Sequence, residues 1–116
     1  MPHRLQYPLG ALTDTSHSAG LACLYPDWVC HGYEHAREKL NTIGTILSGS
    51  VCRSREEVLQ ILTDFMDLIS VTYKLPDLGL HRDQLQHLCD GVAGSLDNDP
   101  AYAVPDIVRK IYADSF

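Results

Sequence analysis

The sequence predicts an all-α fold, a compact bundle of about five to six helices. Apolar residues recur at spacings of three and four along much of the chain, whereas alternating polar and apolar runs of the kind that form strands are scarce. With 116 residues, of which 45% are hydrophobic, the chain is long enough for one domain with a modest apolar core and too short for two ordinary domains. We therefore expect a single helical domain over residues 1–116.

Two helices are expected in the first half of the chain. Thr15 or Ser16 can cap a helix that runs from His17 to about Cys30. A second helix is expected from Glu34 to Leu47, and the turn Ser48-Gly49-Ser50 ends it, because glycine adopts the left-handed conformation that commonly follows a helix.

The clearest helix runs from Ser54 to Tyr73. Ser54 followed by Glu57 is a capping-box pattern, and glutamates at this end complement the positive end of the helix dipole. The apolar stripe is so wide that we expect this helix to be pressed between others in the bundle. The stripe comprises Val58, Ile61, Leu62, Phe65, Leu68, Ile69 and Thr72, widened by Leu59 and Met66.

A break and a short helix follow the long one. Leu75-Pro76 ends the helical pattern, because proline disfavours a helical conformation in the residue before it, and a turn follows at Asp77-Leu78-Gly79. A short helix from about Arg82 to Cys89 is expected to point Leu85 and Leu88 inward.

The remaining chain is expected to form a loop and one last helix. Residues 90–100 are rich in turn formers and predict a loop. Pro105 suits the first turn of the last helix, and Asp106 complements its dipole. The apolar side of this helix, which is expected to reach Phe116, comprises Ile107, Val108, Ile111 and Tyr112.

Charge and composition exclude several classes of partner. The net charge of −6, with no run of basic residues, argues against nucleic-acid binding, which needs a positive surface. The longest apolar tract, residues 58–73, contains Asp64 and Asp67, so a membrane span is not expected. The cysteines form no C-x-x-C pair, which indicates free thiols and a cytoplasmic location. They are Cys23, Cys30, Cys52 and Cys89.

One histidine motif suggests a zinc peptidase. His31-Gly32-Tyr33-Glu34-His35 has the form H-x-x-E-H, in which two imidazoles one helical turn apart bind zinc and the glutamate activates water. Such a site needs a third protein ligand from further along, and the later glutamates all lie close by in sequence. Gly32 also weakens the helix where rigid ligands are needed. A solvated helix face is therefore the better interpretation.

A second constellation lies at the start of the chain. Residues 3–20, with His3, the Pro8-Leu9-Gly10 segment and His17 fourteen residues after His3, resemble the second signature of the iron-containing alcohol dehydrogenases. The apolar continuation to Pro26 fits that signature. Further along, Leu78-Gly79-Leu80, Asn98-Asp99-Pro100, Pro105-Asp106-Ile107 and Ile111-Tyr112 are similar to the closing segment of the family.

The resemblance implies a fold and a missing half. Family members have a nucleotide-binding α/β domain followed by an all-helical domain of the type shared with dehydroquinate synthase-like proteins. Residues 1–116 resemble only the helical domain, so the resemblance implies a fragment, a split-gene product or a truncated copy. The expected partner is the amino-terminal nucleotide-binding half, and a homo-oligomer is a further possibility.

The resemblance also implies a metal site. The family holds a divalent metal, most often Fe²⁺ and sometimes Zn²⁺, with an aspartate and three histidines. The last two histidines correspond to His3 and His17, and the other two ligands would precede Met1. We expect a turn around Pro8-Leu9-Gly10 to fold the segment back so that the two imidazoles meet. The chain departs from the family pattern at Tyr7, where many members have histidine, and at Ser18, where glycine is usual.

The function implied is that of an oxidoreductase. Members of the family interconvert a small alcohol and an aldehyde or ketone with NAD or NADP, which here would bind mainly to the missing domain. The isolated chain is expected to bind metal weakly and to lack dehydrogenase activity, because half of the ligand set is absent. An alternative remains open, that of a degenerate, non-catalytic helical module for binding or assembly. An exposed apolar patch is also expected where the nucleotide-binding domain would dock, and it would give the chain a tendency to associate.

Overall fold

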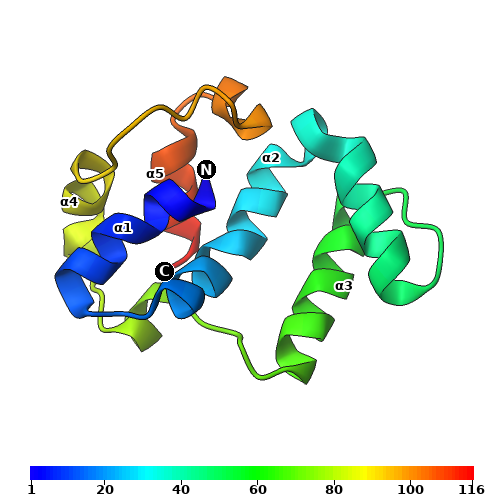
Figure 1. Ribbon diagram of the computed structural model, residues 1–116, viewed down its shortest axis with the longest axis horizontal. Helices are drawn as coiled ribbons and strands as arrows, with labels where there is room; N and C mark the ends of the chain where they lie inside the picture. Colours follow the sequence, from blue (N-terminus) through cyan, green and yellow to red (C-terminus); the bar gives the residue numbers. More distant parts are fainter.

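Five α-helices and three short 3₁₀ segments make up the computed structural model, which describes residues 1–116 and contains no strand (Figure 1). The α-helices are α1 (Pro2–Thr13), α2 (His17–Ser48), α3 (Arg55–Leu68), α4 (Leu85–Asp90) and α5 (Ile107–Asp114). The 3₁₀ segments are η1 (Leu75–Leu78), η2 (Arg82–Gln84) and η3 (Pro100–Ala103). The predicted all-α fold class is confirmed. None of the helices has the length and apolar character that a membrane crossing requires.

Helix α1 was not expected, and it replaces the predicted turn around Pro8-Leu9-Gly10. Proline removes an internal helix hydrogen bond, yet Pro8 lies inside α1 and is buried. Leu5 and Leu9 on the same helix have no exposed surface, so tertiary packing outweighs the local cost of the proline. The chain instead reverses over residues 14–16, where Asp14 takes a left-handed conformation with φ of 57°.

Helix α2 is continuous where two helices were predicted. Ser16 caps it by accepting a hydrogen bond from the backbone N–H of Ala19, and Gly49 ends it with a left-handed φ of 71°, both as expected. The predicted break after Cys30 is wrong, because the helix continues to a kink at Ala36, where φ is −130°. Beyond the kink, the second half of α2 runs beside α3 and away from α1 (Figure 1).

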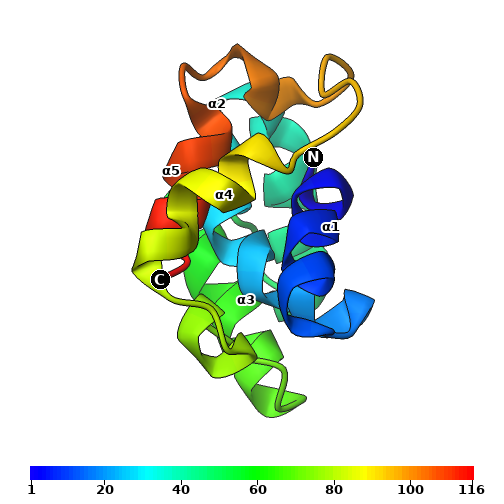
Figure 2. The same cartoon turned by 90° about the vertical axis from the view of Figure 1, so that its left-hand side faces the viewer.

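Two apolar clusters form the core. The larger one gathers α1, the first half of α2, α4 and α5, and these elements lie together in both ribbon views (Figures 1 and 2). Its most deeply buried members include Leu5, Leu9, Leu24, Leu88 and Tyr112. The smaller cluster joins α2 to α3 and comprises Val29, Tyr33, Leu40, Cys52 and Val58. Helix α3 thus packs on the side of α2 that is opposite α1 (Figure 1).

Helix α3 differs from its prediction in length and in burial. Its capping box between Ser54 and Glu57 is present, as expected, but the helix ends at Leu68 and does not reach Tyr73. Only Val58 and Met66 are buried on it, so the expectation that other helices enclose it is wrong. The physical reason is that α3 packs mainly on α2, which leaves the stripe residues Phe65, Leu68 and Ile69 exposed.

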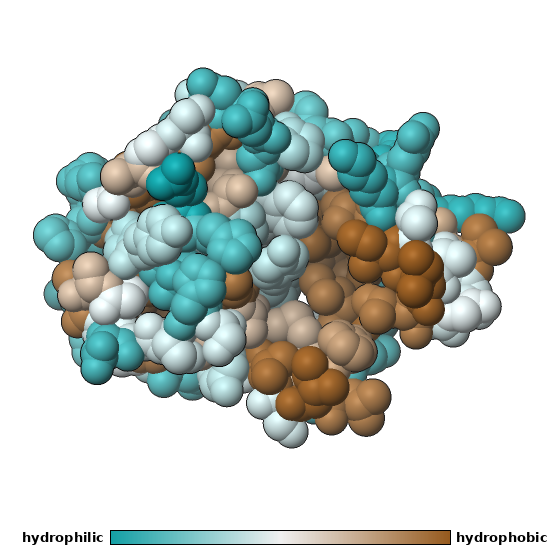
Figure 3. All heavy atoms as spheres, in the orientation of Figure 1, coloured by the Kyte–Doolittle hydropathy of each residue, from teal (hydrophilic) through white to brown (hydrophobic).

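The uncovered side chains form a continuous apolar surface, which we call the α2/α3 apolar face. Brown, hydrophobic atoms gather over these two helices on the right of Figure 3. The face comprises Ile43, Ile46 and Leu47 of α2 together with Phe65, Leu68 and Ile69 at the end of α3, and the exposed fractions reach 81% for Leu68 and 74% for Ile46. A groove of about 310 Å³ lies beside it between α2 and α3. The chain therefore exposes an apolar surface over α2 and α3.

The elements after α3 agree with prediction except at their boundaries. The short helix expected over 82–89 consists of η2 and α4, and Leu88 is fully buried on it. Pro105 precedes the last helix and does not lie in its first turn, because Asp106 takes a left-handed φ of 55° and α5 begins at Ile107. Ile107, Ile111 and Tyr112 are buried on α5, so its apolar side was predicted correctly.

Candidate metal centre

His3 and His17 lie side by side although they belong to different helices. His3 lies in the first turn of α1, and His17 is the first residue of α2. The Nδ1 atom of His3 is 2.9 Å from the Nε2 atom of His17, and the stacked rings have centroids 5.0 Å apart. Both side chains are exposed, so the pair is open to solvent and to groups from outside the chain. The packing of α1 on α2, and not a turn at Pro8-Leu9-Gly10, brings the two imidazoles together.

Gln6 completes the surroundings of the pair. Its Oε1 atom is 2.6 Å from the Nδ1 atom of His17, and the side chain is only 4% exposed. Sequence reasoning missed this residue, because it treated residues 3–20 as a hairpin. A helical interpretation of residues 2–13 would have found it, since Gln6 follows His3 by three positions and three-residue spacing places side chains on one helix face.

The two departures from the family pattern lie at the edge of the pair. The Tyr7 ring is 6.3 Å from the His17 ring, centroid to centroid, and is 55% exposed. Ser18 lies in the first turn of α2, is exposed, and has its hydroxyl oxygen 3.3 Å from that of Ser16. Because Ser18 has a helical backbone, this position does not need the conformational freedom of glycine.

The pair has the chemistry of half a metal site. Imidazole nitrogen is a good ligand for iron and zinc. Two nitrogens bound to one tetrahedral zinc ion, each at about 2.0–2.1 Å, lie about 3.3 Å apart, so a small rotation of the rings suffices to share an ion. No cluster of three or more His, Cys, Asp or Glu side chains occurs anywhere in residues 1–116. The two donors therefore fit a metal in kind and spacing, as two ligands of a larger set.

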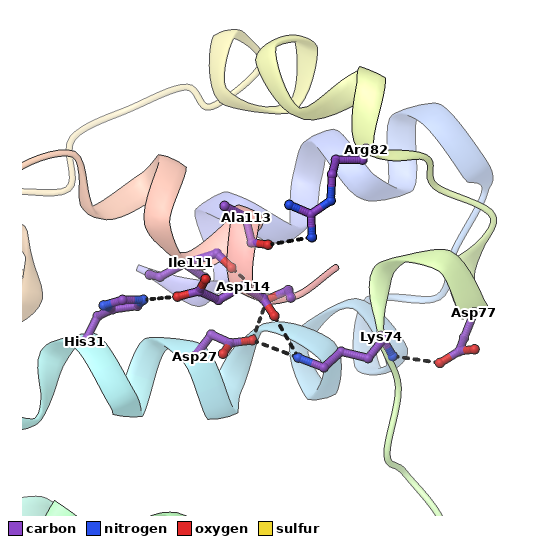
Figure 4. Close-up of polar contacts among 9 residues, drawn as sticks. Asp27, His31, Lys74, Asp77, Arg82, Ile111, Ala113 and Asp114 are labelled. Atoms are coloured by element: carbon purple, nitrogen blue, oxygen red, sulfur yellow. Dashed lines mark hydrogen bonds and ion pairs between the residues drawn. The ribbon is translucent and has the colours of Figure 1, made fainter.

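The H-x-x-E-H motif does not assemble a second site. The Nε2 atom of His31 is 2.7 Å from the Oδ2 atom of Asp114, so this imidazole joins α2 to α5 (Figure 4). Glu34 pairs with Arg37 on the same helix, and His35 is exposed. The motif thus contributes to packing and to a solvated face, in agreement with the interpretation preferred from the sequence.

Other polar contacts near His31 hold the end of α5 in place. The Ser115 hydroxyl donates to Asp27 at 2.8 Å. The Lys74 ammonium donates to the backbone oxygen of Asp114 at 2.8 Å (Figure 4). These contacts fasten the end of α5 to α2 and to the segment before η1. Every group in this cluster therefore has a structural partner.

The cysteines and the remaining histidines lie apart from the pair. All four cysteines are free, as predicted, and burial raises the pKa of the Cys23 thiol to about 12. His81 and His87 are exposed near η2 and α4 and belong to no cluster of metal-ligating side chains. The histidine pair is therefore the one candidate centre that the fold assembles.

Comparison with known proteins identifies the family of this chain. The family model described as "Fe-containing alcohol dehydrogenase family, C-terminal" matches residues 1–116, the full length of the sequence. No match was found among curated proteins or among solved structures. The all-helical fold agrees with this C-terminal family domain, and the match confirms the resemblance described from residues 3–20 and from the later segments. The chain therefore belongs to the Fe-containing alcohol dehydrogenase family.

Proposed function

We propose that this chain provides His3 and His17 as two ligands of the divalent-metal centre in an NAD- or NADP-dependent alcohol dehydrogenase, which interconverts an alcohol and an aldehyde or ketone. The observation that carries the proposal is the 2.9 Å approach of the two imidazoles, in a chain of this family. The spacing of fourteen residues alone does not place two side chains on one helix, so the contact requires the packing of α1 on α2.

The two histidines act by holding the ion on the protein surface. A divalent metal, Fe²⁺ by preference and Zn²⁺ as the second choice, supplies Lewis-acid polarisation of the alcohol oxygen, which favours hydride transfer from carbon to nicotinamide. His17 presents Nε2 and His3 presents Nδ1 toward the shared position. Both rings are exposed, so a second polypeptide segment can reach the same position with additional ligands.

The partner that fits is the amino-terminal nucleotide-binding half of the family. We propose that residues 1–116 form the helical, carboxy-terminal domain of the enzyme and that the other half supplies the remaining aspartate and histidine. That half would also bind the dinucleotide, since the chain contains no glycine-rich G-x-G-x-x-G segment. The isolated chain then binds metal weakly and cannot carry out the reaction, because two ligands make an incomplete coordination sphere.

A second function, that of a non-catalytic helical module for assembly, is favoured by the α2/α3 apolar face. Large exposed apolar surfaces commonly mark sites of association, and Leu68 and Ile46 are each more than 70% exposed, at 81% and 74%. A module of this kind would not need the histidine pair. The two functions therefore differ in whether His3 and His17 matter.

The experiment combines metal titration with an activity assay. The purified chain is titrated with Zn²⁺ and, under anaerobic conditions, with Fe²⁺, and the variants His3→Ala and His17→Ala are titrated alongside. The control is His35→Ala, which removes an exposed imidazole eighteen residues along α2 from His17. NAD- and NADP-dependent oxidation of simple alcohols is then assayed with and without an added amino-terminal half of the family.

The proposal predicts weak binding of one metal equivalent, lost in both pair variants and kept in the control. Activity is expected only when the amino-terminal half is present, and it should disappear again with His17→Ala. Metal binding that is the same in all four proteins, with no activity after the second half is added, would rule out the dehydrogenase role and support the assembly module.

A further inference from the structure

Gln6 is a buried polar residue whose side chain is directed at one of the two histidines. It is 4% exposed, whereas His3 and His17 are exposed. Its Oε1 atom lies 2.6 Å from the Nδ1 atom of His17, a short hydrogen-bond distance. A buried amide normally needs a partner, and here the partner is the imidazole of a proposed metal ligand.

Two glycines form a slot for the Gln6 side chain. A Cβ atom at Gly20 would lie 2.6 Å from the Gln6 Cγ atom, and a Cβ atom at Gly10 would lie 3.2 Å from its Nε2 atom. The first distance is too short for real atoms to adopt, so any larger residue at position 20 must displace Gln6. Gly10 of α1 and Gly20 of α2 thus leave the space that the Gln6 side chain occupies.

The contact defines which nitrogen of His17 carries the proton. An amide oxygen can only accept a hydrogen bond, so Nδ1 of His17 must donate to Gln6. In the neutral imidazole the Nε2 atom then has a free lone pair, and it accepts from His3 in the metal-free chain. This is the same lone pair that a metal ion requires.

We infer that Gln6 is a positioning residue for His17, which fixes the Nδ1–H tautomer and the ring orientation so that Nε2 is ready to bind a divalent metal. The inference rests on the proposed function, because it assigns a role within the same site. Partners that hold the second nitrogen of a ligating histidine typically change metal affinity by about 10- to 100-fold. Gln6 meets the requirements for such a partner, because it is buried, is held by its neighbours and is an acceptor.

The first test reads the tautomer in the metal-free protein. Histidine labelled with ¹⁵N reports which ring nitrogen carries the proton, through two-bond ¹H–¹⁵N correlations recorded at about pH 8, where free imidazole is neutral. The His17 signal is assigned by its absence from His17→Ala. We expect a proton on Nδ1 in the native chain and in Gln6→Glu, which keeps an oxygen acceptor, and a shift of the proton toward Nε2 in Gln6→Met.

The second test measures Zn²⁺ affinity by calorimetric titration of the same proteins. Gln6→Met should weaken binding by about 10-fold or more, and Gln6→Glu should restore it to the native value or better. Gly20→Ala removes no polar atom but displaces Gln6, so it should weaken binding as well. The matched control is Gln60→Met, the same substitution at an exposed position on α3, which should leave Zn²⁺ binding unchanged.

The outcomes separate this inference from the proposed function. A proton on Nε2 of His17 in the native chain, or an unchanged tautomer in Gln6→Met, overturns the positioning role whatever the metal does. A chain that binds no Zn²⁺ but shows the expected tautomers overturns the metal function and leaves the Gln6 contact established. Circular dichroism and urea unfolding of Gln6→Met confirm that its fold is intact; if it unfolds, Gly20→Ala and Gln6→Glu decide the question.

Discussion

The hydroxyl of Tyr112 in α5 donates a hydrogen bond of 2.6 Å to the backbone oxygen of Leu5 in α1, across 107 positions of sequence. Tyr112 is fully buried, and burial, together with the nearby Cys89, raises the pKa of its hydroxyl above the ordinary value, so it stays neutral and acts as a donor. Leu5 lies between His3 and Gln6 in sequence. The bond therefore fixes the turn of α1 that carries the candidate site.

Replacing Tyr112 by phenylalanine should destabilise the fold. The ring still fills its place, but the Leu5 carbonyl loses a buried partner, which typically costs about 1–3 kcal/mol. Urea unfolding measures the loss. Tyr102→Phe is the matched control, because Tyr102 is 52% exposed and its hydroxyl makes no hydrogen bond within the chain. Equal stabilities of the two variants would show that the buried bond contributes nothing.

Replacing Glu57 by glutamine should make the free energy of unfolding depend less on pH at acidic pH. The Glu57 carboxylate accepts hydrogen bonds from the backbone N–H groups of Arg53 and Ser54, and these contacts hold its pKa below the ordinary value of 4.5. A carboxylate with a lowered pKa stabilises the fold above about pH 5, and this contribution is lost as the pH falls through its folded pKa.

Thermal unfolding followed from about pH 6 down to about pH 3 tests the role of Glu57. The native chain should lose more stability over this interval than Glu57→Gln. Glu38→Gln serves as the control, since Glu38 is exposed on α2 and its carboxylate makes no hydrogen bond or ion pair. Parallel profiles for the native chain and Glu57→Gln would contradict the assignment of the capping box as an acid-sensitive contact.

Replacing Gly44 by alanine should destabilise the packing of α3 on α2. An added Cβ atom would lie 2.8 Å from Sγ of Cys52 and 3.3 Å from Cγ2 of Val58. Overpacking of this kind typically costs about 1–3 kcal/mol in folding free energy. Replacing glycine by alanine in a helix gains about 1 kcal/mol, so a cost near the upper end of the overpacking range leaves a net destabilisation.

A double-mutant cycle isolates the Gly44 contact. In a Cys52→Ala background the closest atom is gone, so the cost of Gly44→Ala should be smaller than in the native chain. Urea unfolding of the four proteins provides the coupling free energy. A coupling of zero would show that the sulfur does not limit the space beside Gly44.

Charging the α2/α3 apolar face should improve solution behaviour without loss of stability. Ile46 and Leu68 are each mostly exposed, so lysine at either position removes little buried contact. We expect the double variant Ile46→Lys and Leu68→Lys to bind less hydrophobic dye and to associate less at high concentration, as measured by dye fluorescence and light scattering. Asn98→Lys adds a positive charge at another exposed position, and it should change neither reading.

Local signals in the sequence predicted much of the fold, and the elements that were predicted wrongly depend on tertiary contacts. Ser54 and Glu57 were identified correctly because both partners of a capping box lie within one turn. The helix around Pro8 was missed because burial of its neighbours outweighs the preference of proline. The kink at Ala36 has no local marker, since alanine is the strongest helix former.

The candidate site was predictable only in part. The proximity of His3 and His17 was expected from the family resemblance, and their spacing alone would not have revealed it. Gln6 could not be recognised without the helical form of residues 2–13 and the glycine of α2 that faces it. For Leu68, an apolar pattern indicates which side chains favour burial, but it does not show whether a neighbour is present to cover them.

The two apolar clusters have Trp28 in common and no other side chain. Its indole N–H donates a hydrogen bond of 3.1 Å to Asp99. Trp28 is therefore held in place by the larger cluster, which includes α1 and so the helix of His3. Protein segments with few shared contacts often open as separate cooperative units. Backbone amides of α3 are therefore expected to exchange their hydrogens with solvent in an opening event that leaves those of α1, and the imidazoles beside them, protected.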